Sequence, residues 1–330
     1  MSRAAKGALA FGAAVVLWRT ADLFLFTDVP TGFCAGGAVW RYAAMGLCAL
    51  AAWLFPLAVP RQSAAPGALP GTHAPWCAAF GAACTAFGLW APVSLALYGP
   101  QLSGHHVTPQ REMLAALGLA LRGVWFFALG AVCLLAAWRV YAQREGRALA
   151  LGPGVAASGA LYLHAVLRFI DAPASLHHVQ PTAEVLCALC AVLFFAALLR
   201  AAAPEGAAAR GMCRAGLAAF YFCACWGLPQ LVWQLCTGAA GGTPVLAGFA
   251  LALLGLWGAA VACGAMEGRD AVQTSPARRR SMLCAGAALL PERRGRRKNT
   301  WHLRRGKRQA GPAGYEKRAH RLHQHKAGRR

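Results

Sequence analysis

Long apolar segments alternate with short polar ones along the chain, and this alternation is the strongest pattern in the sequence. Eight segments hold about 20 or more mostly apolar residues, the length that an α-helix needs to cross the hydrocarbon core of a bilayer. They cover roughly residues 7–27, 34–59, 75–98, 112–138, 149–170, 181–201, 212–236 and 244–266. The sequence therefore predicts an all-α, polytopic membrane protein with eight transmembrane helices.

The predicted outer turns resemble one another, which favours four helical hairpins. Residues 103–109 (SGHHVTP) parallel residues 175–181 (SLHHVQP), and residues 26–30 (FTDVP) parallel residues 169–173 (FIDAP). Duplication of a hairpin would explain this recurrence, since repeats build many transporter folds. Independent selection of a good helix start explains it equally well, because proline suits the first turn of a helix.

Basic residues crowd into every second loop. They precede the first segment and follow the second, fourth, sixth and eighth: Arg3, Lys6, Arg61, Arg139, Arg144, Arg147, Arg200, Arg210, Arg214 and the C-terminal tail. Arg111 is the clear exception. Such a bias sets orientation during membrane insertion, so we expect both termini in the cytoplasm.

Charge and composition divide the chain in two. Of the 33 Lys and Arg residues, 19 lie from Gly268 onward, although the formal net charge of the whole chain is +22. We therefore expect an eight-span helical domain over residues 1–267 and a basic, disordered cytoplasmic tail over residues 268–330. The Ala, Gly and Arg bias of the body, with Lys6 as its single lysine, indicates a GC-rich coding sequence and hence a bacterial cytoplasmic membrane.

Charged residues inside the apolar segments are the candidate functional residues, because ionisable groups are costly in lipid. The predicted outer half contains Arg19, Asp22, Arg41, His164, Arg168 and Glu184, and Arg122 lies nearer the middle of its segment. One interpretation is that these groups pair between helices and stabilise the bundle. The other is a polar cavity, open to the outer side, in which surplus guanidinium groups bind a carboxylate, a phosphate or a lipid headgroup.

Histidine pairs in two predicted outer turns are weak metal candidates. Imidazole binds transition metals, and His105, His106, His177 and His178 occupy equivalent positions in their turns. No carboxylate or thiol motif accompanies them, and we expect neither a metal nor a cofactor. Cys187 and Cys190 have CxxC spacing, but they lie within a predicted helix without a second ligand pair, so we interpret them as packing residues.

Membrane lipids are the expected partners of the tail. Its Arg and Lys clusters would bind anionic lipid of the inner leaflet. Nucleic acid is disfavoured, because only Trp301 and Tyr315 are available in the tail for base stacking. The sequence specifies no protein partner.

No catalytic motif is present: the chain lacks paired carboxylates, HExxH, GxSxG, a P-loop and a glycine-rich nucleotide fingerprint. Our leading hypothesis is binding or transport of a small anionic or lipid-derived ligand from the outer side. The competing hypothesis is a non-catalytic membrane scaffold or regulatory subunit with purely structural charges. Small residues such as Gly81, Thr85 and Gly88 predict close helix packing.

The eight-span topology predicts opposite accessibility for two sets of loops. In a background without native cysteines, His105→Cys and His177→Cys should react with an impermeant thiol reagent from one side of the membrane. Arg144→Cys should react only from the other side. Labelling of all three from one side would contradict the topology.

Overall fold

The protein is all-helical in the residues that the computed structural model describes, which are 1–28, 38–59, 73–99, 108–143, 151–171, 179–203, 209–238 and 242–274. Among these, eight helices are long and apolar enough to cross a membrane, as predicted. The chain is therefore a multi-pass membrane protein. The turns between predicted hairpin partners lie largely outside the described residues, so the hairpin arrangement stays a prediction.

The spans agree with the predicted segments to within a few residues at most ends. They are α1 (Arg3–Phe26), α2 (Val39–Leu54) with the 3₁₀ turn η1 (Phe55–Ala58), α3 (Ala74–Tyr98), α4 (Pro109–Gln143), α5 (Leu151–Asp171), α6 (Val179–Ala202), α7 (Ala209–Ala219) with the π-helix η3 (Phe220–Trp226) and α8 (Gly227–Thr237), and α9 (Gly242–Thr274).

Local capping explains where several helices begin and end. α1 starts at Arg3, earlier than predicted, because the Ser2 hydroxyl accepts a hydrogen bond from the Ala5 amide at 3.2 Å. α3 ends at Tyr98 and α8 at Thr237, and the residues that follow them, Gly99 and Gly238, have φ values of 66° and 65°. Glycine adopts positive φ values without steric cost, so a glycine suits the end of each helix.

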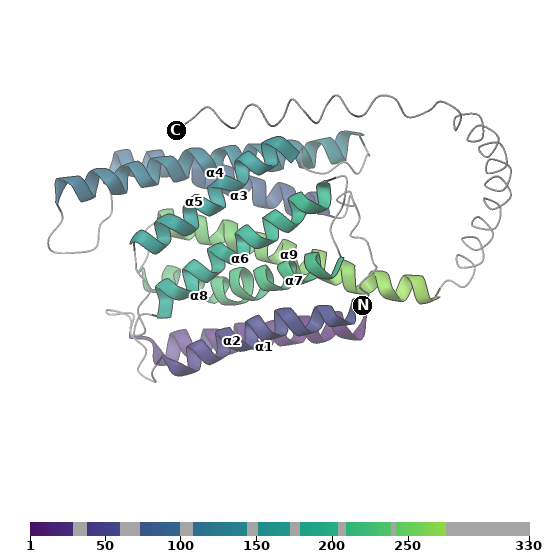
Figure 1. Cartoon of the computed structure of the whole chain (residues 1–330). Coiled ribbons are helices and arrows are strands. Elements are labelled where there is room, and N and C mark those ends of the chain that lie inside the picture. The colour runs from purple at the N-terminus through teal and green to yellow at the C-terminus, as the bar shows by residue number, and fades with distance from the viewer. Residues whose placement is uncertain are drawn as a thin grey trace, which may run out of the picture. The chain divides into compact units, whose positions relative to one another are not determined.

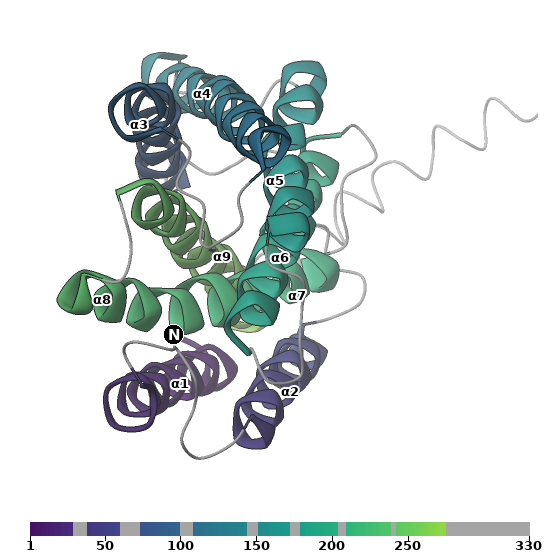
Figure 2. The ribbon, with the colours of Figure 1, turned by 90° about the vertical axis from the view of Figure 1, so that its left-hand side faces the viewer.

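The contacts between residues divide the chain into two units, Met1–Ala271 and Val272–Arg330. Within the first unit, the helices lie side by side, and α6, α7, α8 and α9 occupy its middle (Figures 1 and 2). α3 and α4 pack on one side of this centre, and α1 and α2 lie on the other (Figure 2). The predicted boundary between residues 267 and 268 stays a prediction.

Two helix crossings bring backbones into direct contact. A Cβ atom on Gly130 of α4 would lie 2.3 Å from Thr85 Oγ1 and 2.6 Å from the Gly81 carbonyl of α3. A Cβ on Gly258 of α9 would lie 2.5 Å from the Gly216 carbonyl of α7. Such approaches need residues without side chains, since helices in lipid associate through close packing. The predicted packing role of Gly81, Thr85 and Gly88 is confirmed.

One end of this unit gathers several span termini. The Met1 amino group lies 4.0 Å from Glu267 Oε1, which pairs the start of α1 with the last part of α9. Arg210, at the start of α7, donates hydrogen bonds to the Val59 carbonyl at 2.6 and 3.0 Å, directly after η1. The first residues of α1 and α7 therefore lie at the same end of this unit as the last residues of η1 and as Glu267 of α9. The compartment that this end faces stays a prediction.

Gly130→Ala should lower stability by about 1–3 kcal/mol, because the added methyl group has no space between α3 and α4. Gly46→Ala is the matched control, since a Cβ at position 46 meets nothing within 4 Å. This control should be neutral or slightly stabilising, because alanine favours a helix more than glycine does. Thermal unfolding in one detergent compares the two, and equal effects would contradict the packing described here.

Candidate functional site

A buried carboxylate forms the centre of the candidate site. Asp22 on α1 lies between Arg19, one helical turn before it, and Arg41 on α2. Arg19 Nη1 donates to Asp22 Oδ2, and Arg41 Nε lies 2.9 Å from Oδ2 and 3.0 Å from Oδ1. The exposed fractions are 7% for Asp22, 1% for Arg19 and 3% for Arg41. One negative and two positive charges are thus enclosed by two helices.

Neutral polar groups complete this ion cluster. Arg41 Nη2 donates to Thr27 Oγ1 at 2.6 Å, and Thr27 Oγ1 donates to the Asp22 carbonyl at 3.2 Å. Arg19 Nη2 donates to Gln230 Oε1 on α8 at 3.0 Å. These hydrogen bonds satisfy much of the cluster, which is the condition under which charges persist in a low-dielectric interior.

Trp226 covers the Arg19 guanidinium. The Arg19 Cζ atom lies 4.7 Å from the centre of the indole ring, within range of a cation–π interaction. Trp226 is the last residue of η3, and Gln230 follows one turn later. The π-helix and the start of α8 therefore supply the third wall of the cluster.

A cavity of about 30 Å³ lies beside Arg19 and is also lined by Glu184, Cys187, Trp226 and Gln230. Arg19 Nε, Trp226 Nε1 and Gln230 Nε2 are buried and have no hydrogen-bond acceptor among the described residues. Buried donors are normally satisfied, so three unsatisfied donors on residues that line one cavity are unusual. The volume is on the order of that of one water molecule.

A second charged cluster adjoins the cavity through Glu184. The carboxylate of Glu184 on α6 pairs with Arg168 on α5, and about a quarter of each side chain is exposed. Arg122 and Arg168 interact electrostatically with His164, which is buried and packs edge-on against Phe126 with ring centres 5.6 Å apart.

All seven sequence candidates thus fall into two clusters that approach each other at the cavity, where Arg19 and Glu184 line the same space. The first cluster contains Arg19, Asp22 and Arg41, and the second contains Arg122, His164, Arg168 and Glu184. Neither Gln230 nor Trp226 belongs to these seven charged candidates. The signal for Gln230 was an amide within an apolar segment, whereas nothing local distinguishes Trp226 from the other tryptophans.

Two buried thiols stabilise the π-helix that carries Trp226. The Cys187 thiol donates to the Phe222 carbonyl at 2.9 Å, and the Cys223 thiol donates to the Cys187 carbonyl at 3.1 Å. Pro229 follows the π-helix, and a proline crowds the carbonyl four residues before it, here that of Cys225. The wider π-turn accommodates this crowding. Cys187 therefore bonds to backbone, as well as packing as the sequence predicted.

Within the described ranges, no group of three or more His, Cys, Asp or Glu side chains could hold a metal ion. The weak candidates His105, His106, His177 and His178 lie outside those ranges. Metal binding by these histidines stays an untested hypothesis.

Asp22→Asn should destabilise the protein by about 3–5 kcal/mol, because it leaves two buried guanidinium groups without a counterion. Glu267→Gln removes one carboxylate from an exposed pair and should change stability by less than about 1 kcal/mol. Unfolding of both variants in the same detergent tests this difference. A small effect of Asp22→Asn would contradict the central role of the carboxylate.

No protein-family model, curated protein or solved structure matches the chain at a significant level.

Proposed function

We propose that this multi-pass membrane protein binds a small anion at the cavity between the two charged clusters. The observation that carries the proposal is the set of three unsatisfied donors, Arg19 Nε, Trp226 Nε1 and Gln230 Nε2, on residues that line one small cavity. Each donor is buried, so water outside the protein does not satisfy it. An anionic oxygen or a halide is the acceptor that donors of this kind prefer.

The charge balance supports an anion. Among the seven charged candidates of the two clusters, four are arginines and two are carboxylates, and this excess of arginine is consistent with an anionic ligand. Asp22 and Glu184 already engage arginines. In a low-dielectric interior, surplus charge favours a ligand that neutralises it.

The size of the cavity favours a small ligand over a lipid-derived one. A space of about 30 Å³ holds a single ion or the end of a carboxylate, whereas sites for larger ligands measure about 300–1,000 Å³. A lipid headgroup would require the lining side chains to separate. Access from the outer side and transport across the membrane are further parts of this proposal.

A structural scaffold is the second candidate, and the Asp22 cluster favours it. Both carboxylate oxygens of Asp22 already have donors, and Arg19 and Arg41 each make a further hydrogen bond. Such a cluster links helices without any ligand. Under this hypothesis Asp22→Asn lowers thermal stability and no small molecule restores it.

A thermal-shift screen of the purified protein against halides, phosphate, short carboxylates, acidic lipids and divalent metals tests the proposal. A binding anion at 100 times its Kd should stabilise the protein by about 2.7 kcal/mol. Arg168→Leu should remove most of this response, because it takes a positive charge from the second charged cluster. The variant should still insert into the membrane. Arg139→Leu, an equal change at an exposed position of α4, should retain the response.

Absence of any anion-dependent shift would exclude the proposal and leave the scaffold. Equal responses from Arg168→Leu and Arg139→Leu would place the anion elsewhere in the protein. Uptake of a stabilising anion into sealed proteoliposomes then separates transport from binding.

A further inference from the structure

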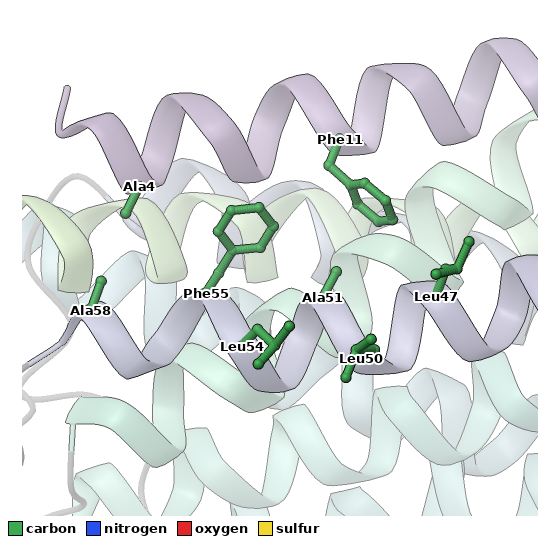
Figure 3. Close-up of a pocket in the computed structure, with 8 residues that line it drawn as sticks. All are labelled: Ala4, Phe11, Leu47, Leu50, Ala51, Leu54, Phe55 and Ala58. Carbon is green, nitrogen blue, oxygen red and sulfur yellow. The ribbon is translucent and has the colours of Figure 1, made fainter.

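An apolar groove of about 420 Å³ separates α1 from α2 in the half of these helices away from the Asp22 cluster (Figure 3). Ala4 and Phe11 line it from α1, and Leu47, Leu54 and Ala58 are among the residues that line it from α2 and η1. Figure 3 shows Ala4 and Ala58 at one end and Leu47 at the other. Leu47 and Leu54 are about half exposed, so the groove is open to the surroundings of the helices.

The length of the groove matches one leaflet of a bilayer. From Leu47 to Ala58, the helix advances about 16 Å at 1.5 Å per residue. The hydrocarbon core of a bilayer is about 30 Å thick, so one leaflet contributes about half of that. Ala58 ends its span and Ala4 is the second residue of its span. The groove therefore runs from the membrane surface toward the bilayer centre.

Basic side chains surround the surface end of the groove. Arg3 directly precedes Ala4 and is exposed. Arg210 donates to the Leu57 and Val59 carbonyls on either side of Ala58, at 3.3 and 2.6 Å. Lipid phosphates lie at this level of a membrane, so cations here are complementary to an anionic headgroup.

Two further contacts indicate that this end of the groove lies where the hydrocarbon of the membrane meets the lipid headgroups. Arg214 lies over the ring of Trp53, with its Cζ atom 5.3 Å from the ring centre. Tryptophan gathers where hydrocarbon meets headgroups. Glu267 also lies at this end, but the Met1 amino group faces it at 4.0 Å. Arg3, Arg210 and Arg214 therefore give this end of the groove a net positive charge.

We propose that this groove binds one acyl chain of an anionic phospholipid, whose phosphate interacts with Arg3 and Arg210. An acyl chain gains no hydrophobic free energy by leaving the bilayer for the groove, because lipid is as apolar as leucine. Selectivity therefore comes from the headgroup, and anionic lipids bind in preference to zwitterionic ones. This site is separate from the proposed anion cavity.

Native mass spectrometry of the full chain, titrated with phosphatidylglycerol or phosphatidylcholine, tests the proposal. The protein should retain phosphatidylglycerol preferentially. Arg3→Gln should reduce that preference about fivefold, since each basic residue near the surface contributes about 1 kcal/mol. Arg139→Gln removes one exposed charge from α4 and should leave the preference unchanged.

The groove itself is tested by a matched pair of bulky substitutions. Leu54 lines the groove and is 46% exposed, whereas Leu57 does not line it and is 44% exposed. Leu54→Trp should reduce retention of phosphatidylglycerol, and Leu57→Trp should not. Thermal unfolding confirms that each variant is folded, and Leu47→Trp replaces Leu54→Trp if the latter is not.

Equal retention of the two lipids by the unmodified protein would overturn the proposal, as would equal effects of the two tryptophan variants. A dimer that Leu54→Trp dissociates would identify a second copy of the chain as the occupant instead.

Discussion

The enclosed carboxylate of Asp22 is the constraint on which the arrangement of α1, α2 and α8 depends. An unpaired charge in a membrane interior is costly, so Asp22 requires cations at hydrogen-bond distance. Arg19 comes from its own helix, whereas Arg41 has to come from α2. Arg19 then reaches Gln230, which fixes the register of α8 against α1. One carboxylate, two guanidinium groups and one amide thus link three helices.

Close backbone packing joins other helices of the same unit. The crossings at Gly130 and at Gly216 with Gly258 bring helices together without side chains between them. The π-helix adds a local change of twist, which the thiols of Cys187 and Cys223 stabilise through backbone carbonyls. π-Turns are frequent at functional sites. Here the π-turn places Trp226 over Arg19 and beside the proposed anion cavity.

The two proposed sites differ in the physics of recognition. The proposed anion cavity is small and is lined by three residues with unsatisfied donors and by Glu184, so binding there would depend on charge and hydrogen bonding in a low dielectric. The groove between α1 and α2 is open and apolar, and the charges that would select its lipid lie at the membrane surface. α1 takes part in both, with Arg19 at one site and Ala4 and Phe11 at the other.

The sequence by itself determined the helical class, the eight spans and the identity of the intramembrane charges, because both hydrocarbon length and the cost of charge in lipid are local properties. The Arg19–Asp22 pair is also local, since residues three apart share a helix face. Only the tertiary structure decided that Arg41 completes this pair, that Glu184 engages Arg168, and that Trp226 and Gln230 line one cavity with Arg19. These partners lie on different helices. Their meeting depends on how helices rotate and pack against one another, which periodicity within a single segment does not encode.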